Sequence, residues 1–202
     1  GGMVVVARMQ GNPDALTLGL VVMLAMTGSC VLSGVSGAIV PLTLKKLGAD
    51  PGTFTELAEK GEASFRAKFW KESLGHYLDT VEPDDGSLRP NQLIAMSLPF
   101  GPAEGPNAVQ ALELVRQKLV TPNGVRTLGP AEPGYRGRYE GPMAERDSAY
   151  HQGTSWPWLL GPYASAVLRL KGDVEEVKSL LSPVRHWLST YGIGGIAEVY
   201  DG

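Results

Sequence analysis

The sequence predicts an all-α fold in which helices are separated by long loops. Three observations support this prediction. Apolar residues recur at three- and four-residue steps in several segments after residue 52. No run of alternating β-branched residues is long enough for a central strand. Finally, the 26 glycines and 15 prolines favour frequent turns over long uninterrupted helices.

Composition limits the classes of partner. The chain has 202 residues, enough for one well-packed domain and a smaller appendage. Its formal net charge is −3 and no basic patch is visible, so we expect no nucleic-acid partner. The single cysteine, Cys30, excludes an intramolecular disulfide and fits a reducing compartment. We therefore expect a cytoplasmic protein.

The first segment, residues 1–52, differs from the rest because residues 15–44 contain no charged residue and no histidine. A helix of roughly 20 apolar residues can span a bilayer. Lys45 and Lys46 follow as cationic flanks. The segment therefore predicts an apolar helix long enough to attach the chain to a membrane. A cleaved signal peptide and a buried helix of a soluble protein are the alternatives.

The second segment, residues 53–202, carries the helical periodicity. Its first helix begins at Thr53 or Thr55 as the cap, and proline is expected at the first position of the next two helices. Glycines 192 and 194 are expected to end the last helix. The predicted helices cover residues 53–70, 91–98, 106–121, 158–170 and 174–191.

Four loops between these helices, at residues 89–92, 124–139, 146–158 and 194–202, combine aromatic, amide and charged side chains. Tyrosine and tryptophan rings can stack on sugar rings, and amides can exchange hydrogen bonds with hydroxyl groups in both directions. This composition predicts binding of a neutral polyol. The aromatic and polar candidates are Tyr135, Tyr139, Tyr150, Trp156, Trp158, Asn91, Gln92, His151 and Gln152.

Cleavage of a glycosidic bond needs one carboxylic acid and one base or nucleophile. The residues themselves do not choose among the carboxylates of these loops, which are Glu140, Glu145, Asp147, Glu198 and Asp201. Structural roles are the alternative for several candidates. Trp156 and Trp158 can be core anchors, His151 a hydrogen-bonded structural histidine, and Glu198 a surface carboxylate.

Two further interpretations concern charge and metal binding. Arg146 and the adjacent Asp147 can form a structural ion pair. The three histidines, His76, His151 and His186, have no metal-ligand spacing, so we expect neither a metal nor a cofactor.

Four stretches together resemble the glycogen debranching enzyme family, in the C-terminal half of its amylo-α-1,6-glucosidase domain. They occur in the family's order and cover most of residues 53–202. They are SLRPNQLIAMSLPF (87–100), LVTPNGVRTLGPAEPGYRGRYEGP (119–142), ERDSAYHQGTSWPWLLGPYASAVLRL (145–170) and YGIGGIAEVYDG (191–202).

The resemblance implies an (α/α)6 toroid, present here in part, whose loops surround the site. It also implies inverting hydrolysis of α-1,6-glucosidic bonds in branched α-glucans such as glycogen and limit dextrin. The motif GIAEVYDG then makes Glu198 the general base. By the same resemblance, the residues that bind substrate are Arg89, Asn91, Gln92, Asp147, Tyr150, His151, Gln152 and Trp156.

The family's general acid lies in an upstream Gly-Arg-Asp motif, which this sequence does not contain. We therefore expect the chain alone to be hydrolytically inactive. A partial toroid would expose apolar faces, so we also expect poor stability or oligomerisation. A non-catalytic glucan-binding module is the alternative function.

Residues 3–52 bear a separate resemblance, carried by the string SGVSGAIVPLTLKKLGADP (33–51), to a transmembrane helix of MgtE-type magnesium transporters. The implied architecture is a fusion of a transporter-like helix with a glucosidase fragment. The further alternative is a membrane protein in which this helix is the functional part.

Overall fold

The computed structural model describes residues 51–190 and 194–202. The chain divides into two units, residues 1–57 and 58–202. The apolar helix predicted at residues 15–44 lies outside the described residues. Among the helices that are described, none combines the length and the apolar character needed to cross a membrane.

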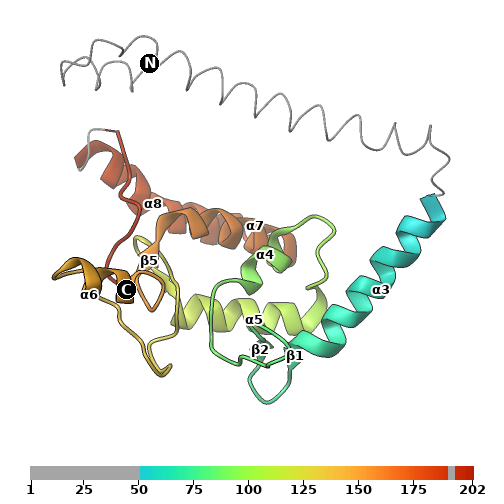
Figure 1. The fold of residues 1–202 in the computed structure, drawn as a ribbon. Coiled ribbons are helices and arrows are strands. Elements are labelled where there is room, and N and C mark those ends of the chain that lie inside the picture. Colours follow the sequence, from blue (N-terminus) through green and yellow to red (C-terminus); the bar gives the residue numbers. More distant parts are fainter. Residues whose placement is uncertain (1–50, 191–193) are drawn as a thin grey trace, which may run out of the picture. The chain divides into compact units, whose positions relative to one another are not determined.

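About half of the described residues are helical, and the strands are short (Figure 1). Each helix expected from apolar periodicity is present, and its ends differ from the prediction by a few residues. The helices are α3 (Pro51–Phe69), α4 (Gln92–Ser97), α5 (Gly105–Lys118), α6 (Met143–Ala149), α7 (Leu160–Lys171) and α8 (Val174–Thr190). A single 3₁₀ turn, η1 (Pro157–Leu159), leads into α7.

Two predictions about helices need correction, one about where a helix begins and one about a segment predicted as a loop. Helix α4 begins at Gln92, so Pro90 precedes the capping residue Asn91 instead of occupying the first helical position. Helix α6 occupies part of the segment that was predicted as a loop. Only Ala149 of α6 is buried, so the helix has no apolar stripe from which it could have been predicted.

The sequence predicted none of the five short strands, and β3 takes the place of the end of the helix predicted at 106–121. Strands β1 (Trp70–Lys71) and β2 (His76–Tyr77) form an antiparallel hairpin. Strands β3 (Val120–Thr121), β4 (Gly124–Arg126) and β5 (Ser155–Trp156) form an antiparallel sheet in that order. This small sheet joins the end of α5 to the segment before α7.

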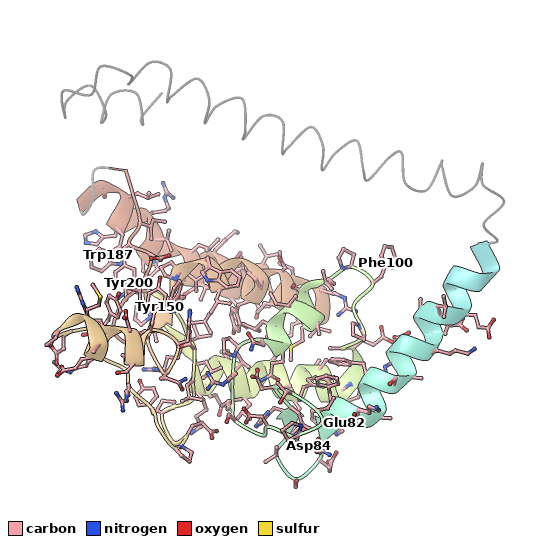
Figure 2. The ribbon with its side chains drawn as sticks, in the orientation of Figure 1. Glu82, Asp84, Phe100, Tyr150, Trp187 and Tyr200 are labelled. Carbon is pink, nitrogen blue, oxygen red and sulfur yellow. The ribbon has the colours of Figure 1, made fainter. Side chains whose placement is uncertain are left out.

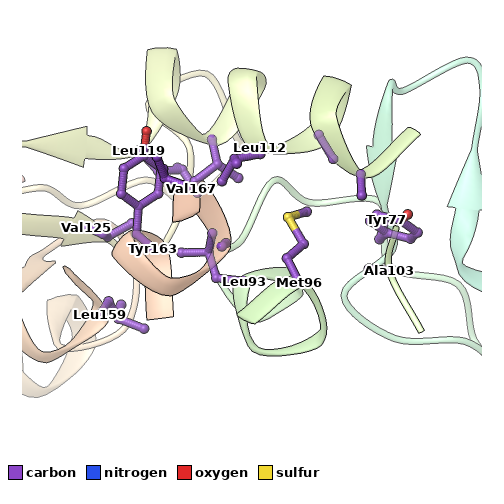
Figure 3. Packing of buried hydrophobic residues seen from close by; sticks show 14 of the residues in the cluster. Tyr77, Leu93, Met96, Ala103, Leu112, Leu119, Val125, Leu159, Tyr163 and Val167 are labelled. Atoms are coloured by element: carbon purple, nitrogen blue, oxygen red, sulfur yellow. The ribbon is translucent and has the colours of Figure 1, made fainter. Parts of the chain in front are cut away.

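Helix α7 is at the centre of the packing and contacts α4, α5 and α8. Its residues Tyr163 and Val167 are fully buried and meet Leu93 of α4 and Leu112 of α5 in one apolar cluster (Figure 3). Burying one such side chain stabilises a fold by about 1.5–3 kcal/mol. The apolar stripes that predicted these helices therefore form the core.

Arg169 at the end of α7 fixes the link between α4 and α5. Its guanidinium donates hydrogen bonds to the carbonyl oxygens of Met96 at 3.0 Å, Ala103 at 2.7 Å and Gly101 at 3.1 Å. A side chain on Gly101 would meet the carbonyl oxygen of Ala95, so the link is also packed closely. Helix α4 is thereby held against α7, and the residues just before α4 have a fixed position.

Candidate active site

The C-terminal segment joins the small sheet beside β5. The amide of Ser155 donates to the Tyr200 carbonyl at 2.8 Å, and the amide of Tyr200 donates back to Ser155 at 2.9 Å. The Asp201 carboxylate accepts a hydrogen bond from the amide of Tyr139 at 2.9 Å. These contacts bring the three loops at 124–139, 146–158 and 194–202 together.

An aromatic cluster covers this junction. The ring of Tyr150 lies 4.7 Å from the rings of Trp156 and His151 and 5.7 Å from that of Tyr139, measured between centroids. His151 stacks on Trp156 at 5.0 Å. Figure 2 shows Tyr150 and Tyr200 at the same end of the domain, far from Phe100.

Glu198 lies against Tyr150. The pKa of the Tyr150 phenol is raised, first by burial and then by its hydrogen bond to the Glu198 carboxyl. A phenol that donates to a carboxylate loses this interaction when it ionises, which explains the direction of the second contribution. Glu198 is itself exposed to solvent. Its carboxyl group is therefore both close to the Tyr150 phenol and accessible to water or ligand.

Two hollows adjoin at Trp156 and Trp158, which line both of them. The first, called here the Asn91 hollow, has a volume of about 230 Å³. The second, called the Glu198 hollow, has a volume of about 540 Å³. The Asn91 hollow is lined by Arg89, Pro90, Asn91, Thr127, His151, Trp156, Trp158 and Leu159. The Glu198 hollow is lined by Trp156, Pro157, Trp158, Ile196, Ala197 and Glu198.

Arg89 lines the Asn91 hollow and also ties it together. Its guanidinium donates to the carbonyl oxygens of Thr127 at 3.1 Å and His151 at 3.0 Å, and to the side-chain oxygen of Gln152 at 3.2 Å. It also lies 3.8 Å from the Asp79 carboxylate. Since these contacts use most of its donors, Arg89 shapes the hollow more than it reaches into it.

The two amides beside Arg89 have different surroundings. Asn91 lines the Asn91 hollow and donates to the Asp79 carboxylate at 2.7 Å. Gln92 is only 7% exposed, donates to the Arg89 carbonyl at 3.0 Å and lines neither hollow. The structure thus places Gln92 inside the fold, as a support for the turn before α4.

Three other predicted binding residues also lie outside the linings of the hollows. Tyr150 lines neither hollow, although its ring contacts those of Trp156 and His151. Asp147 is exposed on α6 and lines neither hollow. The side-chain oxygen of Gln152 accepts a hydrogen bond from Arg89, and Gln152 lines neither hollow. The ion pair expected between Arg146 and Asp147 is not formed in the described part of the chain, where Arg146 lies 6.0 Å over the Tyr139 ring instead.

The five candidate carboxylates are separated by the fold. Glu198 is the only carboxylate among the described residues that line the two hollows. Glu140 lies 3.7 Å from Arg138 at the surface, and Asp201 holds the Tyr139 amide. Glu145 is exposed on α6, like Asp147. Within the described residues, no three histidine, cysteine, aspartate or glutamate side chains gather as a metal site would require.

The two tryptophans, for which the sequence left core and binding roles open, differ from each other. Trp156 is 7% exposed, and its indole N–H donates to the Tyr150 carbonyl and the Thr154 hydroxyl, each at 3.1 Å. Trp158 is 59% exposed and lines both hollows. The sequence pattern Trp-Pro-Trp did not distinguish them, because only the strand and 3₁₀ turn decide which side chain faces inward.

Comparison with known proteins identifies the family to which this chain belongs. The family model described as amylo-alpha-1,6-glucosidase matches residues 32–202. The chain belongs to the amylo-alpha-1,6-glucosidase family. A glycogen debranching enzyme from Saccharomyces cerevisiae is 35% identical to it over 89 residues, which is 41% of this chain and 6% of that protein. The chain therefore spans a small part of the curated relative that it matches.

The amylo-alpha-1,6-glucosidase match confirms the first resemblance drawn from the sequence but not the second. It begins at residue 32, inside the segment that resembled a magnesium transporter. The transporter resemblance of residues 3–52 finds no support in these comparisons. The boundary between residues 52 and 53 stays a prediction.

Proposed function

We propose that this chain binds the end of a branched α-glucan and takes part in inverting hydrolysis of its α-1,6-glucosidic bonds. One observation carries the proposal: a carboxyl group, Glu198, lies within an aromatic hollow formed by the loops that define the family resemblance. Glu198 is the candidate base, and Tyr150, His151, Asn91 and Trp156 are the candidate sugar contacts. The surrounding helices would form part of an (α/α)6 toroid.

The chemistry assigns Glu198 a specific task. In an inverting glycosidase the base activates a water molecule on the face of the sugar opposite the leaving group. The carboxyl of Glu198 is exposed, so water can reach it, and it lies close enough to the Tyr150 phenol to help raise the pKa of that phenol. A carboxylate that is accessible and hydrogen-bonded on one side can take a proton from that water.

A glucan-binding module without hydrolytic activity is the second candidate. It is favoured by the finding that Glu198 is the only carboxylate lining the hollows in the described ranges, whereas glycoside hydrolysis needs two. Under either proposal a cytoplasmic location fits the reducing environment inferred from Cys30.

Purified full chain incubated with branched limit dextrin tests both candidates. We expect the wild type and Glu198→Gln to bind the dextrin by isothermal titration calorimetry, and neither to release glucose. Glucose release by the wild type that Glu198→Gln abolishes would show that the chain also holds the acid, which removes the second candidate. A folded chain that binds no α-glucan contradicts both.

A further inference from the structure

Asn91 stands at the N-terminal cap position of α4 but does not cap the helix. Asparagine is favoured at this position because its side-chain oxygen accepts a hydrogen bond from a backbone amide of the first helical turn. Asn91 makes no such hydrogen bond, and its backbone is already helical. Its side chain lines the Asn91 hollow and contacts Asp79, which lies just after β2. The side chain of Asn91 therefore has a role other than capping.

The contact with Asp79 decides which way the Asn91 amide faces. The side-chain nitrogen of Asn91 donates to the Asp79 carboxylate at 2.7 Å. A carboxylate can only accept, whereas an amide has its donors on the nitrogen and its acceptor on the oxygen. The oxygen of the amide must therefore face away from Asp79. No hydrogen bond to this oxygen is formed within the described residues, so it is the polar atom that Asn91 can offer to a ligand.

Asp79 is suited to hold Asn91 because it is itself fixed. Its backbone amide donates to the Asp85 carbonyl at 2.9 Å, and the preceding residue, Leu78, is buried. The Asp79 side chain is only 13% exposed and lies 3.8 Å from the Arg89 guanidinium. A carboxylate with so little access to water needs partners within the protein, and its hydrogen bonds are stronger than those between neutral groups. The amide of Asn91 is thereby kept in one orientation.

We propose that Asp79 is a positioning residue that turns the Asn91 oxygen toward the Asn91 hollow, so that the hollow selects a ligand whose hydroxyl group donates a hydrogen bond at this point. Asp79 lines neither hollow, so its effect on a ligand passes through Asn91. The inference rests on the proposed function and adds to it a determinant of specificity that lies outside the hollows.

The experiment asks whether the site distinguishes a hydroxyl group from a fluorine atom and whether Asp79 sets this preference. Isothermal titration calorimetry is run on the full chain with isomaltose and with deoxyfluoro isomaltoses, in which one hydroxyl group at a time is replaced by fluorine. Fluorine cannot donate a hydrogen bond, so the affinity lost on replacement reports on the acceptor. The proteins are the wild type, Asp79→Asn, Asn91→Ala, the double variant and Asp84→Asn.

Each variant tests one step of the inference. Asp79→Asn keeps the shape of the side chain, but its amide lets Asn91 approach with either its nitrogen or its oxygen. Asn91→Ala removes the acceptor itself. Asp84→Asn is the matched control, because it removes an equal charge from the loop after β2, where Asp84 pairs with Lys71 at 3.0 Å and lines neither hollow. Thermal unfolding followed by circular dichroism checks that each variant is folded.

At one position of the sugar, we expect fluorine to lower the affinity of the wild type and of Asp84→Asn by about threefold or more. Asn91→Ala should lose this preference, Asp79→Asn should lose most of it, and the double variant should match Asn91→Ala because Asp79 acts through Asn91. No preference in the wild type, or an equal one in Asp79→Asn, would overturn the inference while binding of isomaltose leaves the proposed function standing. A folded wild type that binds no isomaltose overturns both.

A measurement on the wild type keeps the inference testable if Asp79→Asn does not fold. Hydrogen exchange of the Asn91 side-chain amide is followed by NMR, with Asn91→Ala identifying its signal. The reference is Asn107, which is exposed on α5 and makes no side-chain hydrogen bond within the described residues. We expect slower exchange at Asn91 because its amide is bonded to Asp79. Equal rates at the two amides would overturn the inference.

Discussion

Two tyrosines each lie beside a glutamate, one pair in the helical core and one pair at the candidate site. In the core, the buried Tyr163 hydroxyl donates to Glu176 at 2.6 Å, and the same carboxylate is paired with Lys171 at 2.5 Å. At the site, the Glu198 carboxyl contributes to the raised pKa of the Tyr150 phenol, and Glu198 has no cationic partner among the described residues.

The two carboxylates therefore differ in their surroundings. That of Glu176 is engaged by two partners within the fold, whereas that of Glu198 is exposed to solvent. Glu176 is neutralised by a lysine and joins α7 to α8, so its hydrogen bonds contribute to folding. Glu198 is exposed and has no cationic partner among the described residues, so its carboxyl group is accessible to a ligand. The comparison predicts that substitutions near Glu176 change stability, whereas substitutions near Glu198 change ligand binding.

Substitution of Arg89 is expected to have the largest effect on stability. It also challenges the contrast between core and site, because Arg89 lines the site but makes several hydrogen bonds within the fold. We expect Arg89→Met to lower the free energy of unfolding by about 2–3 kcal/mol, because two carbonyl groups and the Asp79 carboxylate lose a charged partner. Urea unfolding followed by circular dichroism measures the change.

Arg138→Met is the matched control for Arg89, because Arg138 is exposed and lies 3.7 Å from Glu140 in a surface pair. We expect this control to change the free energy of unfolding by less than about 1 kcal/mol. If both variants unfold at the same urea concentration, Arg89 does not support the fold and the division between site and core is wrong at this residue.

Removing each tyrosine hydroxyl compares the two glutamates directly. Tyr163→Phe should lower the free energy of unfolding by about 1–2 kcal/mol, because the partly buried Glu176 loses a donor. Tyr150→Phe should cost less than about 1 kcal/mol, because the exposed Glu198 can bond to water instead. Thermal or urea unfolding of both variants measures the two losses of stability and shows which is larger. A larger loss for Tyr150→Phe would reverse the comparison.

The helical part of the fold could be predicted because its signal is periodic. The stripes that include Leu93, Leu112 and Val167 are the residues that the core buries completely. The short strands and α6 could not be predicted this way, because two- or three-residue strands and a helix that buries one residue leave no period to detect. Their positions depend on contacts between segments far apart in the chain.

The sequence was also limited in predicting which side chains of the candidate site are buried and which line the hollows. The resemblance pointed to three loops that the structure brings together, with Tyr150, Trp156 and Glu198 near one another. It did not indicate which residue types face the hollows. Gln92, expected to bind substrate, is buried, and Trp158, for which two roles were open, is exposed, since burial is decided by the turn before α4 and by η1.

The smallest expected effect concerns the ionisation of Tyr150. The raised pKa of Tyr150 means that folding favours the neutral phenol. The resulting contribution to the free energy of unfolding is complete below the ordinary tyrosine pKa of about 10 and is lost as pH rises through the raised value. Glu198→Gln removes the negative charge, so the Tyr150 pKa should fall toward its ordinary value. Burial, the first cause of the shift, should keep it from returning completely.

Titration of ¹³C-labelled tyrosine by NMR measures this change, and Tyr150→Phe identifies the Tyr150 signal. Glu140→Gln is the control, because it removes an equal charge that pairs with Arg138 and does not contribute to the Tyr150 shift. A Tyr150 pKa that stays the same in Glu198→Gln would mean that the phenol does not hold the carboxyl group in solution. The orientation of Glu198 would then depend only on the main-chain pairing between Ser155 and Tyr200.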